Sequence, residues 1–487
     1  MCDPKSSKLT WLTLAGLALL SSLFWADCVF GPYTPLAAEF QAQMEPWASE
    51  ASLPAVTRQW DPLLWDGVAQ FYPWRLFAAR MMREGQPALW NPPQFCGSPF
   101  ASNGQSALFY PPNWLLALVN VKLGLGLLAM LHYFLAAALT FLLCRQLRAE
   151  HLPAAFAAIA FAFGGFMVTW TELPTLMNCA AWLPGGLLGV TLIFSRNRWG
   201  APVLALSLGM SILAGHFQIA AYVWLATAVY ALARVVWEAA NHRPARIGPL
   251  AGAVAIGLAL ASAQLLPTLE LARNSTRGAA KPSVEAFEQF HAPRALQVGQ
   301  LITLLRPDAL GSPARGDHLL THAGLPYSEY CGFAGMATLA LALVGIGLSR
   351  TRHFAFFIVL AVAALNVAMG GPLARLMYLH VPGLAQTGGF ARFLCVYTFA
   401  IAMAGGLGLN AVCERLRRHD EICLDDLAGE DGAALGDDDD DHERGDCPWN
   451  MSAATGLCVV ALLVLVFELL PWGHGFLPRT RRENVYP

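Results

Sequence analysis

The chain alternates long apolar runs with short polar segments. A run of about 20 apolar residues is long enough to cross a bilayer as a helix. Eleven runs meet this description, near residues 9–30, 122–144, 153–171, 175–195, 200–215, 218–237, 247–269, 331–349, 354–370, 391–413 and 451–471. The pattern predicts an all-α polytopic membrane protein with about eleven transmembrane helices.

The composition supports this class and excludes others. Hydrophobic residues make up 56% of the 487 positions and charged residues only 13%, whereas soluble domains carry about 25% charged residues. The formal net charge of −2 gives no signal for nucleic acid. The first run follows Lys5 and Lys8 but has no small-residue cleavage site near Trp25, so we expect a retained anchor rather than a signal peptide.

Basic residues predict the orientation of the helices. Cytoplasmic loops carry an excess of Lys and Arg. With these spans, six basic clusters lie on one side of the membrane: Lys5/Lys8, Arg145/Arg148, Arg196/Arg198, Arg243/Arg246, Arg350/Arg352 and Arg415/Arg417/Arg418. We therefore expect a multi-pass protein with a cytoplasmic N-terminus, in a bacterial inner membrane. Only the tail disagrees, because Arg479, Arg481 and Arg482 would lie outside.

This topology divides the chain into three parts. Residues 1–413 form the transmembrane module, with extracytoplasmic loops at about 31–121 and 270–330. Residues 414–450 form a cytoplasmic linker that contains the acidic run DDDDDHERGD from Asp437, and such runs are usually solvated. Residues 451–487 contain the last transmembrane helix and a short tail.

The large first extracytoplasmic loop is unusually polar and aromatic for so apolar a chain. Residues 36–46 and 74–84 place apolar side chains at helical spacing beside charges, which predicts two interfacial helices. Between Asp66 and Pro111 the loop combines carboxylates, amides, rigid Pro/Gly turns and aromatic rings. This mixture is typical of a surface that recognises an amphipathic substrate at the lipid–water boundary.

An ordered series of motifs gives the chain a family resemblance. The series reads Asp66-Gly-Val-Ala-Gln70-Phe-Tyr72-Pro73, Gly85-x-Pro87-x-Leu-Trp90-Asn91-Pro92, Gly97-x-Pro99-Phe, Asn103-x-Gln105, Tyr110-Pro111, Trp182-Leu-Pro184, Gly215-His216-Phe-Gln218, Gln264-Leu-Leu-Pro267, Leu305-Arg306-Pro307-Asp308, Tyr330-Cys-Gly332 and Gly389-Phe-Ala-Arg392-Phe. From about residue 60 to 410 it resembles the YfhO family of bacterial membrane proteins. That family is similar to GT-C-type glycosyltransferases.

The resemblance implies a fold and an activity. It implies a GT-C-like enzyme that moves a sugar from a polyprenyl-phosphate carrier to an envelope glycan or glycolipid acceptor at the outer face of the membrane. In that superfamily a catalytic acidic residue lies in the first extracytoplasmic loop, which is where Asp66 lies. Family members commonly continue with more helices and an extracytoplasmic domain. Relative to the family we therefore expect a C-terminally shortened chain. A partner protein is one candidate to supply the missing region.

The residue types fit this chemistry. Inverting sugar transfer uses a carboxylate as general base for the acceptor hydroxyl, for which Asp66 is the first candidate and Asp61 the second. The leaving phosphate needs cationic groups or hydrogen-bond donors, and amides and aromatic rings suit the sugar. The candidates for substrate binding are Gln70, Tyr72, Arg75, Trp90, Asn91, Asn103, Gln105, Glu172, His216, Arg273 and Arg392.

Each candidate has a simpler structural interpretation. Asp66 is also suited to cap a helix that begins at Gly67, and Asp61 to a turn before Pro62. Glu172 and His216 are equally compatible with interfacial side chains. A divalent cation such as Mg²⁺ or Mn²⁺ could use the oxygen ligands of Asp61, Asp66 and Glu172, but the sequence neither requires a cofactor nor defines a metal site.

Two other functions stay open at the level of sequence. A flippase or transporter of lipid-linked sugars would place ionisable residues or broken helices at the bilayer midplane. Here the apolar runs are nearly free of charge and the charged residues gather at the outer ends, which favours chemistry at the surface. A non-catalytic scaffold for envelope assembly is the second alternative.

Overall fold

The computed structural model describes residues 4–43, 45, 47–49, 63, 65–276, 281–318, 325–431 and 453–486. A helix occupies each of the eleven predicted segments, so their positions are confirmed. In two segments the helix is interrupted and continues as a second, short helix. The helices are α1 (Pro4–Phe24), α5 (Val121–Gln146), α6 (His151–Ala162) with α7 (Gly165–Thr169), α8 (Pro174–Ala180) with α9 (Leu183–Phe194), α10 (Gly200–Leu213), α11 (Phe217–Ala239), α12 (Ile247–Arg273), α15 (Met336–Leu348), α16 (Arg352–Ala368), α18 (Leu394–Asp431) and α19 (Ala453–Phe476).

The number of clear membrane crossings is smaller than eleven. By length and composition, eight helical segments of the described chain could cross a membrane, and α16 with α17 (Pro372–His380) makes a ninth that bends by 76°. The helices α10 and α15 have only 14 and 13 residues. At 1.5 Å per residue they reach about 20 Å, less than the roughly 30 Å of the hydrocarbon core.

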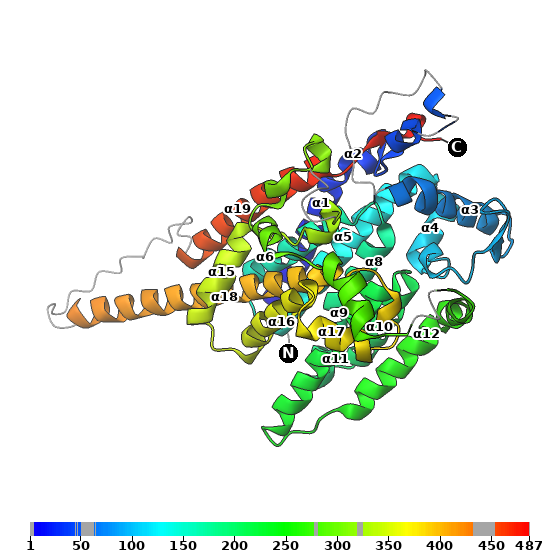
Figure 1. Cartoon of the computed structure of the whole chain (residues 1–487). Helices are drawn as coiled ribbons and strands as arrows, with labels where there is room; N and C mark the ends of the chain where they lie inside the picture. Colours follow the sequence, from blue (N-terminus) through cyan, green and yellow to red (C-terminus); the bar gives the residue numbers. More distant parts are fainter. Residues whose placement is uncertain are drawn as a thin grey trace.

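The interrupted helices form the centre of the bundle. Nearly all residues of α6–α7, α8–α9 and the apolar first part of α18 are buried, whereas few residues of α1, α12 and α19 are, as expected for helices that face lipid (Figure 1). The break between α6 and α7 lies at Gly164 and Gly165. A Cβ atom on Gly165 would lie 2.8 Å from both Cys331 Sγ and Phe333 N. Glycine therefore permits the close approach that carries the chain toward Glu172.

The two ends of the bundle differ in character. We call the end that carries the described residues within 25–120 and 274–330 the loop face. We call the opposite end, which carries the turns at 146–150, 195–199, 240–246 and 349–351, the arginine face. This relative arrangement agrees with the predicted topology. Which face is cytoplasmic stays a prediction.

The first loop contains short, irregular elements on the loop face. The predicted helix at 74–84 is present as α3 (Tyr72–Arg83), whereas 36–46 contains a short 3₁₀ turn, Ala38–Gln43, in place of the predicted helix. The other elements of this loop are α2 (Ala26–Val29), β1 (Tyr33–Thr34), 3₁₀ turn Trp47–Ser49, π-helical turn Gly67–Phe71, β2 (Trp90–Asn91), β3 (Ser98–Pro99), 3₁₀ turns Gly104–Ser106 and Pro111–Trp114, and α4 (Leu115–Leu118).

The second loop and the tail lie on the same face. Strand β4 (Thr480–Arg481) pairs antiparallel with β1, so that Tyr33 is opposite Arg481, and β2 pairs with β3. The remaining elements are α13 (Val284–Ala286), π-helical turn Phe287–His291, α14 (Tyr327–Tyr330), and the 3₁₀ turns Ala292–Arg294, Val298–Leu304, Pro307–Leu310, Pro313–Arg315, Leu384–Gln386, Phe390–Phe393 and Arg482–Asn484.

The segment predicted as an acidic linker, 414–450, begins as helix. Helix α18 continues without a break to Asp431 and projects from the arginine face (Figure 1). The acidic run that starts at Asp437 lies outside the described residues.

Candidate functional site

Asp66 lies where the first loop turns into a π-helical segment. Its own backbone is helical, with φ −58° and ψ −28°, and its side chain makes no capping hydrogen bond. The alternative role as a helix cap is therefore wrong. Instead the Gln70 side chain donates a 2.6 Å hydrogen bond from Nε2 to Asp66 Oδ1. Single π-helical turns often occur at functional sites, and here the turn fixes the direction of a carboxylate.

Gly67 brings Asp66 close to Glu172. A Cβ atom on Gly67 would lie 3.1 Å from the Glu172 carbonyl oxygen, so a larger residue would push the two segments apart. A cavity of about 30 Å³ lies beneath this contact, bordered by Gly67, Arg75, Glu172 and Asn178 among others. Because one water needs roughly 10–15 Å³ measured this way, the cavity has room for a few waters at most and not for a sugar.

Two residues predicted to contact the substrate, Arg75 and Tyr72, make hydrogen bonds within the protein instead. Arg75 is buried and donates through Nη1 to the Ser106 carbonyl oxygen. Burial lowers the pKa of Arg75 to about 10. The Tyr72 hydroxyl donates a 3.1 Å hydrogen bond to the Tyr486 carbonyl oxygen. In this structure both side chains hold the loop together beneath Asp66.

Arg392 is the centre of a second polar group, at the start of α18. Its Nε and Nη2 both lie 2.8 Å from Glu329 Oε1, and its guanidinium carbon is 5.1 Å from the centre of the Trp170 ring. The Nη1 atom has only long contacts, 3.4 Å to Gln218 Oε1 and 3.5 Å to His216 Nε2. One edge of this guanidinium is therefore fixed by an ion pair, and the other is weakly held.

The charges of the two groups influence each other. Burial raises the pKa of Asp66, while the hydrogen bond from Gln70 and the positive charge of Arg392 oppose that rise. Burial and Arg392 lower the pKa of His216 to about 3, so its imidazole is neutral at neutral pH. Since His216 Nδ1 accepts from the Ile219 backbone N–H, we place the ring proton on Nε2.

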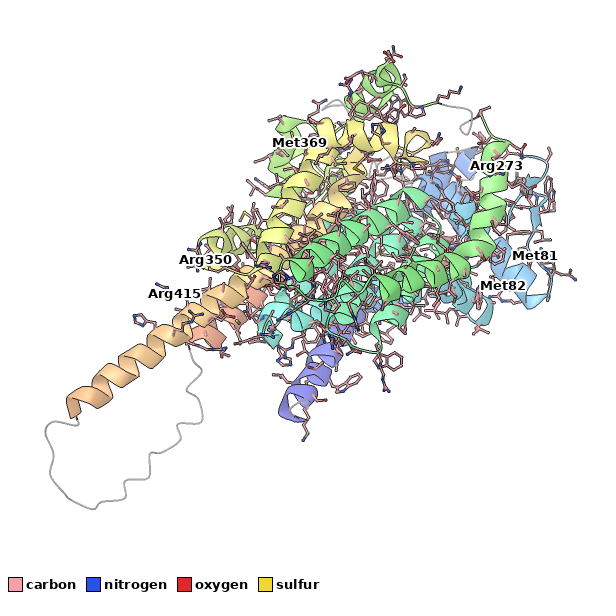
Figure 2. All side chains as sticks on the ribbon, turned by 90° about the horizontal axis from the view of Figure 1, so that it is seen from below. Met81, Met82, Arg273, Arg350, Met369 and Arg415 are labelled. Atoms are coloured by element: carbon pink, nitrogen blue, oxygen red, sulfur yellow. The ribbon has the colours of Figure 1, made fainter. Side chains whose placement is uncertain are left out.

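The other predicted residues lie apart from this centre. Trp90 is 54% exposed. Asn91 is buried, and its Nδ2 donates to Gln94 Oε1. Asn103 accepts from the backbone N–H of Gln105, whose side chain is exposed. Arg273 is exposed at the end of α12, far from the arginine face (Figure 2). Asp61 lies outside the described residues.

Three neighbours of Arg392 were not predicted from the sequence: Glu329, Gln218 and Trp170. Gln218 and Glu329 lie in or beside the quoted motifs at Gly215 and Tyr330. Their partnership with Arg392 had no local signal, because 63 residues separate Glu329 from Arg392. Within the described chain, no three His, Cys, Asp or Glu residues are arranged to hold a metal ion.

Residues 66–302 match the family model described as bacterial membrane protein YfhO. The match covers slightly less than half of the chain. The matched region begins at Asp66 itself and includes Glu172 and His216, whereas Glu329 and Arg392 follow it. No curated protein matches the chain.

Several solved structures are similar in overall architecture. The apo oligosaccharyltransferase of Archaeoglobus fulgidus has a TM-score of 0.43 at 14% identity, over 96% of this chain and 57% of that one. The same organism's AglB, in complex with an inhibitory peptide and a dolichol-phosphate, has a TM-score of 0.42 at 13% identity, over 96% and 56%. ArnT from Cupriavidus metallidurans bound to undecaprenyl phosphate has a TM-score of 0.39 at 13% identity, over 85% and 72%. The chain thus spans little more than half the length of the archaeal enzymes.

Proposed function

We propose that this protein is a GT-C-type membrane glycosyltransferase. It would move a sugar from a polyprenyl-phosphate carrier to an envelope glycan or glycolipid acceptor, at the outer face of a bacterial inner membrane. The observation that carries the proposal is the environment of Asp66. A partly buried carboxylate on the loop face, oriented by Gln70 and within electrostatic reach of Arg392, combines a base with a cation at the membrane surface.

The proposed reaction is one inverting displacement. The acceptor hydroxyl oxygen forms a bond to the anomeric carbon as the bond from that carbon to the phosphate oxygen breaks. Asp66 takes the hydroxyl proton, and polyprenyl phosphate leaves with the bonding electrons. Burial strengthens Asp66 as a base by raising its pKa, and a base with a pKa nearer the working pH is more effective.

Arg392 would stabilise the departing phosphate. Its Nε and Nη2 are committed to Glu329, but Nη1 has only long contacts and can turn toward a phosphate oxygen. Arg is well suited to such contacts because its guanidinium is planar and permanently charged. The neutral His216 beside it would act as a donor through Nε2 rather than as a second cation.

The sugar would bind outside the small cavity beneath Gly67. Since that cavity is too small for a sugar, the substrate would bind on the open side of Asp66. Glu172, Arg75 and Tyr72 would then support the loop from below. Substrate contacts by Trp90, Asn91, Asn103, Gln105 and Arg273 stay predictions, and so does a role for Asp61 as a second base.

The test compares envelope glycans in a deletion strain complemented by wild type, Asp66→Asn or Glu84→Gln. Glu84 is an exposed carboxylate of the same loop, paired with Arg80, and serves as the matched control. At equal expression we expect Asp66→Asn to abolish glycosylation and Glu84→Gln to preserve it. Full restoration by Asp66→Asn would refute the role of Asp66 as base. Accumulation of carrier-linked sugar on the cytoplasmic side would instead indicate a flippase.

A further inference from the structure

A large cavity opens at the arginine face, at the opposite end of the bundle from Asp66. Its volume is about 1180 Å³, and it is bordered by the turns after α5, α9, α11 and α15 and by the middle of α18. Eight arginines line it: Arg148, Arg196, Arg234, Arg243, Arg246, Arg350, Arg415 and Arg418. Figure 2 shows Arg350 and Arg415 near each other at this end, remote from Arg273.

The cavity carries an excess of positive charge. Only two carboxylates line it, Glu238 and Glu414. Arg234 and Arg243 lie within 4.0 Å of Glu238, and Arg418 lies 3.8 Å from Glu414. The other five lining arginines have no ion pair with any residue that the structure describes. The excess of arginines over carboxylates makes the cavity electropositive, and such a cavity attracts anions.

Topology alone does not account for this convergence. The positive-inside rule explains why arginines occur at this face, but it does not direct them into one cavity. Arg198 and Arg352 are exposed at the same face and lie outside the cavity. Arg417 also lies outside it and forms an ion pair with Glu150. The lining arginines are therefore a subset that the fold brings together.

Three of the lining arginines occupy backbone positions that favour glycine. Arg148, Arg196 and Arg246 have φ values of 70°, 57° and 53°, in the left-handed region. Residues with a Cβ atom are strained there. Arg148 and Arg196 follow helix ends, where glycine is the usual choice, and Arg246 immediately precedes α12. Arginine stands at these three positions although glycine would relieve the strain.

We propose that this cavity binds a phosphate-bearing anion with more than one negative charge. The guanidinium fork matches phosphate oxygens in geometry and charge, and basic pockets between transmembrane helices are known to suit anionic headgroups. The anion comes either from a phospholipid of the adjoining leaflet or from solution. The inference is independent of the proposed transferase activity, because it involves none of the residues around Asp66.

The experiment uses the purified full chain in nanodiscs of zwitterionic phosphatidylcholine at physiological salt, where weak surface attraction is screened. One arm titrates inorganic pyrophosphate and measures its Kd. The other adds cardiolipin, whose headgroup carries two phosphates, and counts retained lipids by native mass spectrometry. The test variant is Arg350→Gln/Arg415→Gln. The matched control is Arg198→Gln/Arg352→Gln, which removes the same charge from the same face.

We expect the test variant to bind roughly 30-fold more weakly than wild type, because each arginine near an anionic surface contributes about fivefold. The control variant should bind as wild type does. Binding in the pyrophosphate arm identifies a soluble anion, and binding in the cardiolipin arm alone identifies a lipid headgroup. No binding in either arm, or equal weakening by both double variants, overturns the proposal.

Discussion

The ion pair between Arg392 and Glu329 predicts a large and specific loss of stability when one partner is removed. The two side chains are only 18% and 7% exposed, so solvent screening of the pair is small. In Arg392→Met the Glu329 carboxylate would remain buried without its counter-charge. Breaking a buried pair in this way costs about 3–5 kcal/mol. The exposed Arg273, replaced in the same way, should change stability by less than about 0.5 kcal/mol.

The double variant Arg392→Met/Glu329→Gln separates the charge effect from packing. It removes both charges and leaves a buried amide, which costs about 1–3 kcal/mol. The double variant should therefore be more stable than Arg392→Met by about 2 kcal/mol. Thermal melting of the purified protein, with free energies of unfolding from denaturant titration, gives the comparison.

The same variants test the role of Arg392 in the reaction. If Arg392 meets the leaving phosphate, the double variant recovers stability but not envelope glycosylation. Recovery of both would assign Arg392 a structural role alone. Equal stability of the single and double variants would refute the reasoning, because it would mean that Glu329 does not carry an uncompensated charge when Arg392 is absent.

Two pH effects follow from the buried groups of the site. Burial raises the pKa of folded Asp66 above its usual 3.8, so ionisation of this carboxyl disfavours folding. The melting temperature of Asp66→Asn should therefore be slightly above that of wild type at pH 7. The difference should vanish below about pH 3.8, where Asp66 is protonated in both the folded and the unfolded state. The pKa of His216 is about 3 in the folded protein, against 6.5 when unfolded. The neutral, buried imidazole therefore contributes its full stability to the fold above pH 6.5, and this contribution is lost as the pH falls toward 3. His216→Asn should therefore lose less melting temperature than wild type between pH 7 and pH 4.5.

Hydrophobic patterning predicted where the helices lie but not how far each one reaches. The segments at 200–215 and 331–349 are apolar enough to span, yet helices α10 and α15 are short. Gly335, just before α15, has φ 93°, and a Cβ atom there would lie 2.6 Å from Leu465 Cδ1. The helix boundary therefore depends on packing against α19. A tertiary contact of this kind cannot be seen in a local window of sequence.

The candidate site shows the same division between local and distant signals. The Asp66–Gln70 hydrogen bond joins residues four apart, and both belong to one motif in the sequence. The Arg392–Glu329 pair joins the turn before α18 to α14, 63 residues earlier in the chain, and only the fold reveals it. Tyr72 and Arg75 looked like substrate contacts because they are polar and aromatic. In the structure both side chains are buried, and their hydrogen bonds are to the protein itself.

Two basic residues of the tail have partners on the loop face. Arg479 Nε lies 2.6 Å from Asp27 Oδ2, and Arg482 Nη2 donates to the Cys28 carbonyl oxygen, so these two charges are neutralised or satisfied on the loop face itself.

The tail also reaches the candidate site. The Tyr486 hydroxyl donates a 2.6 Å hydrogen bond to the Val68 carbonyl oxygen, while the Tyr72 hydroxyl donates to the Tyr486 carbonyl oxygen. Val68 is two residues from Asp66, inside the π-helical turn that directs its carboxylate. The packing of the last described residues is therefore part of what fixes the geometry of Asp66, even though the two segments are more than 400 positions apart.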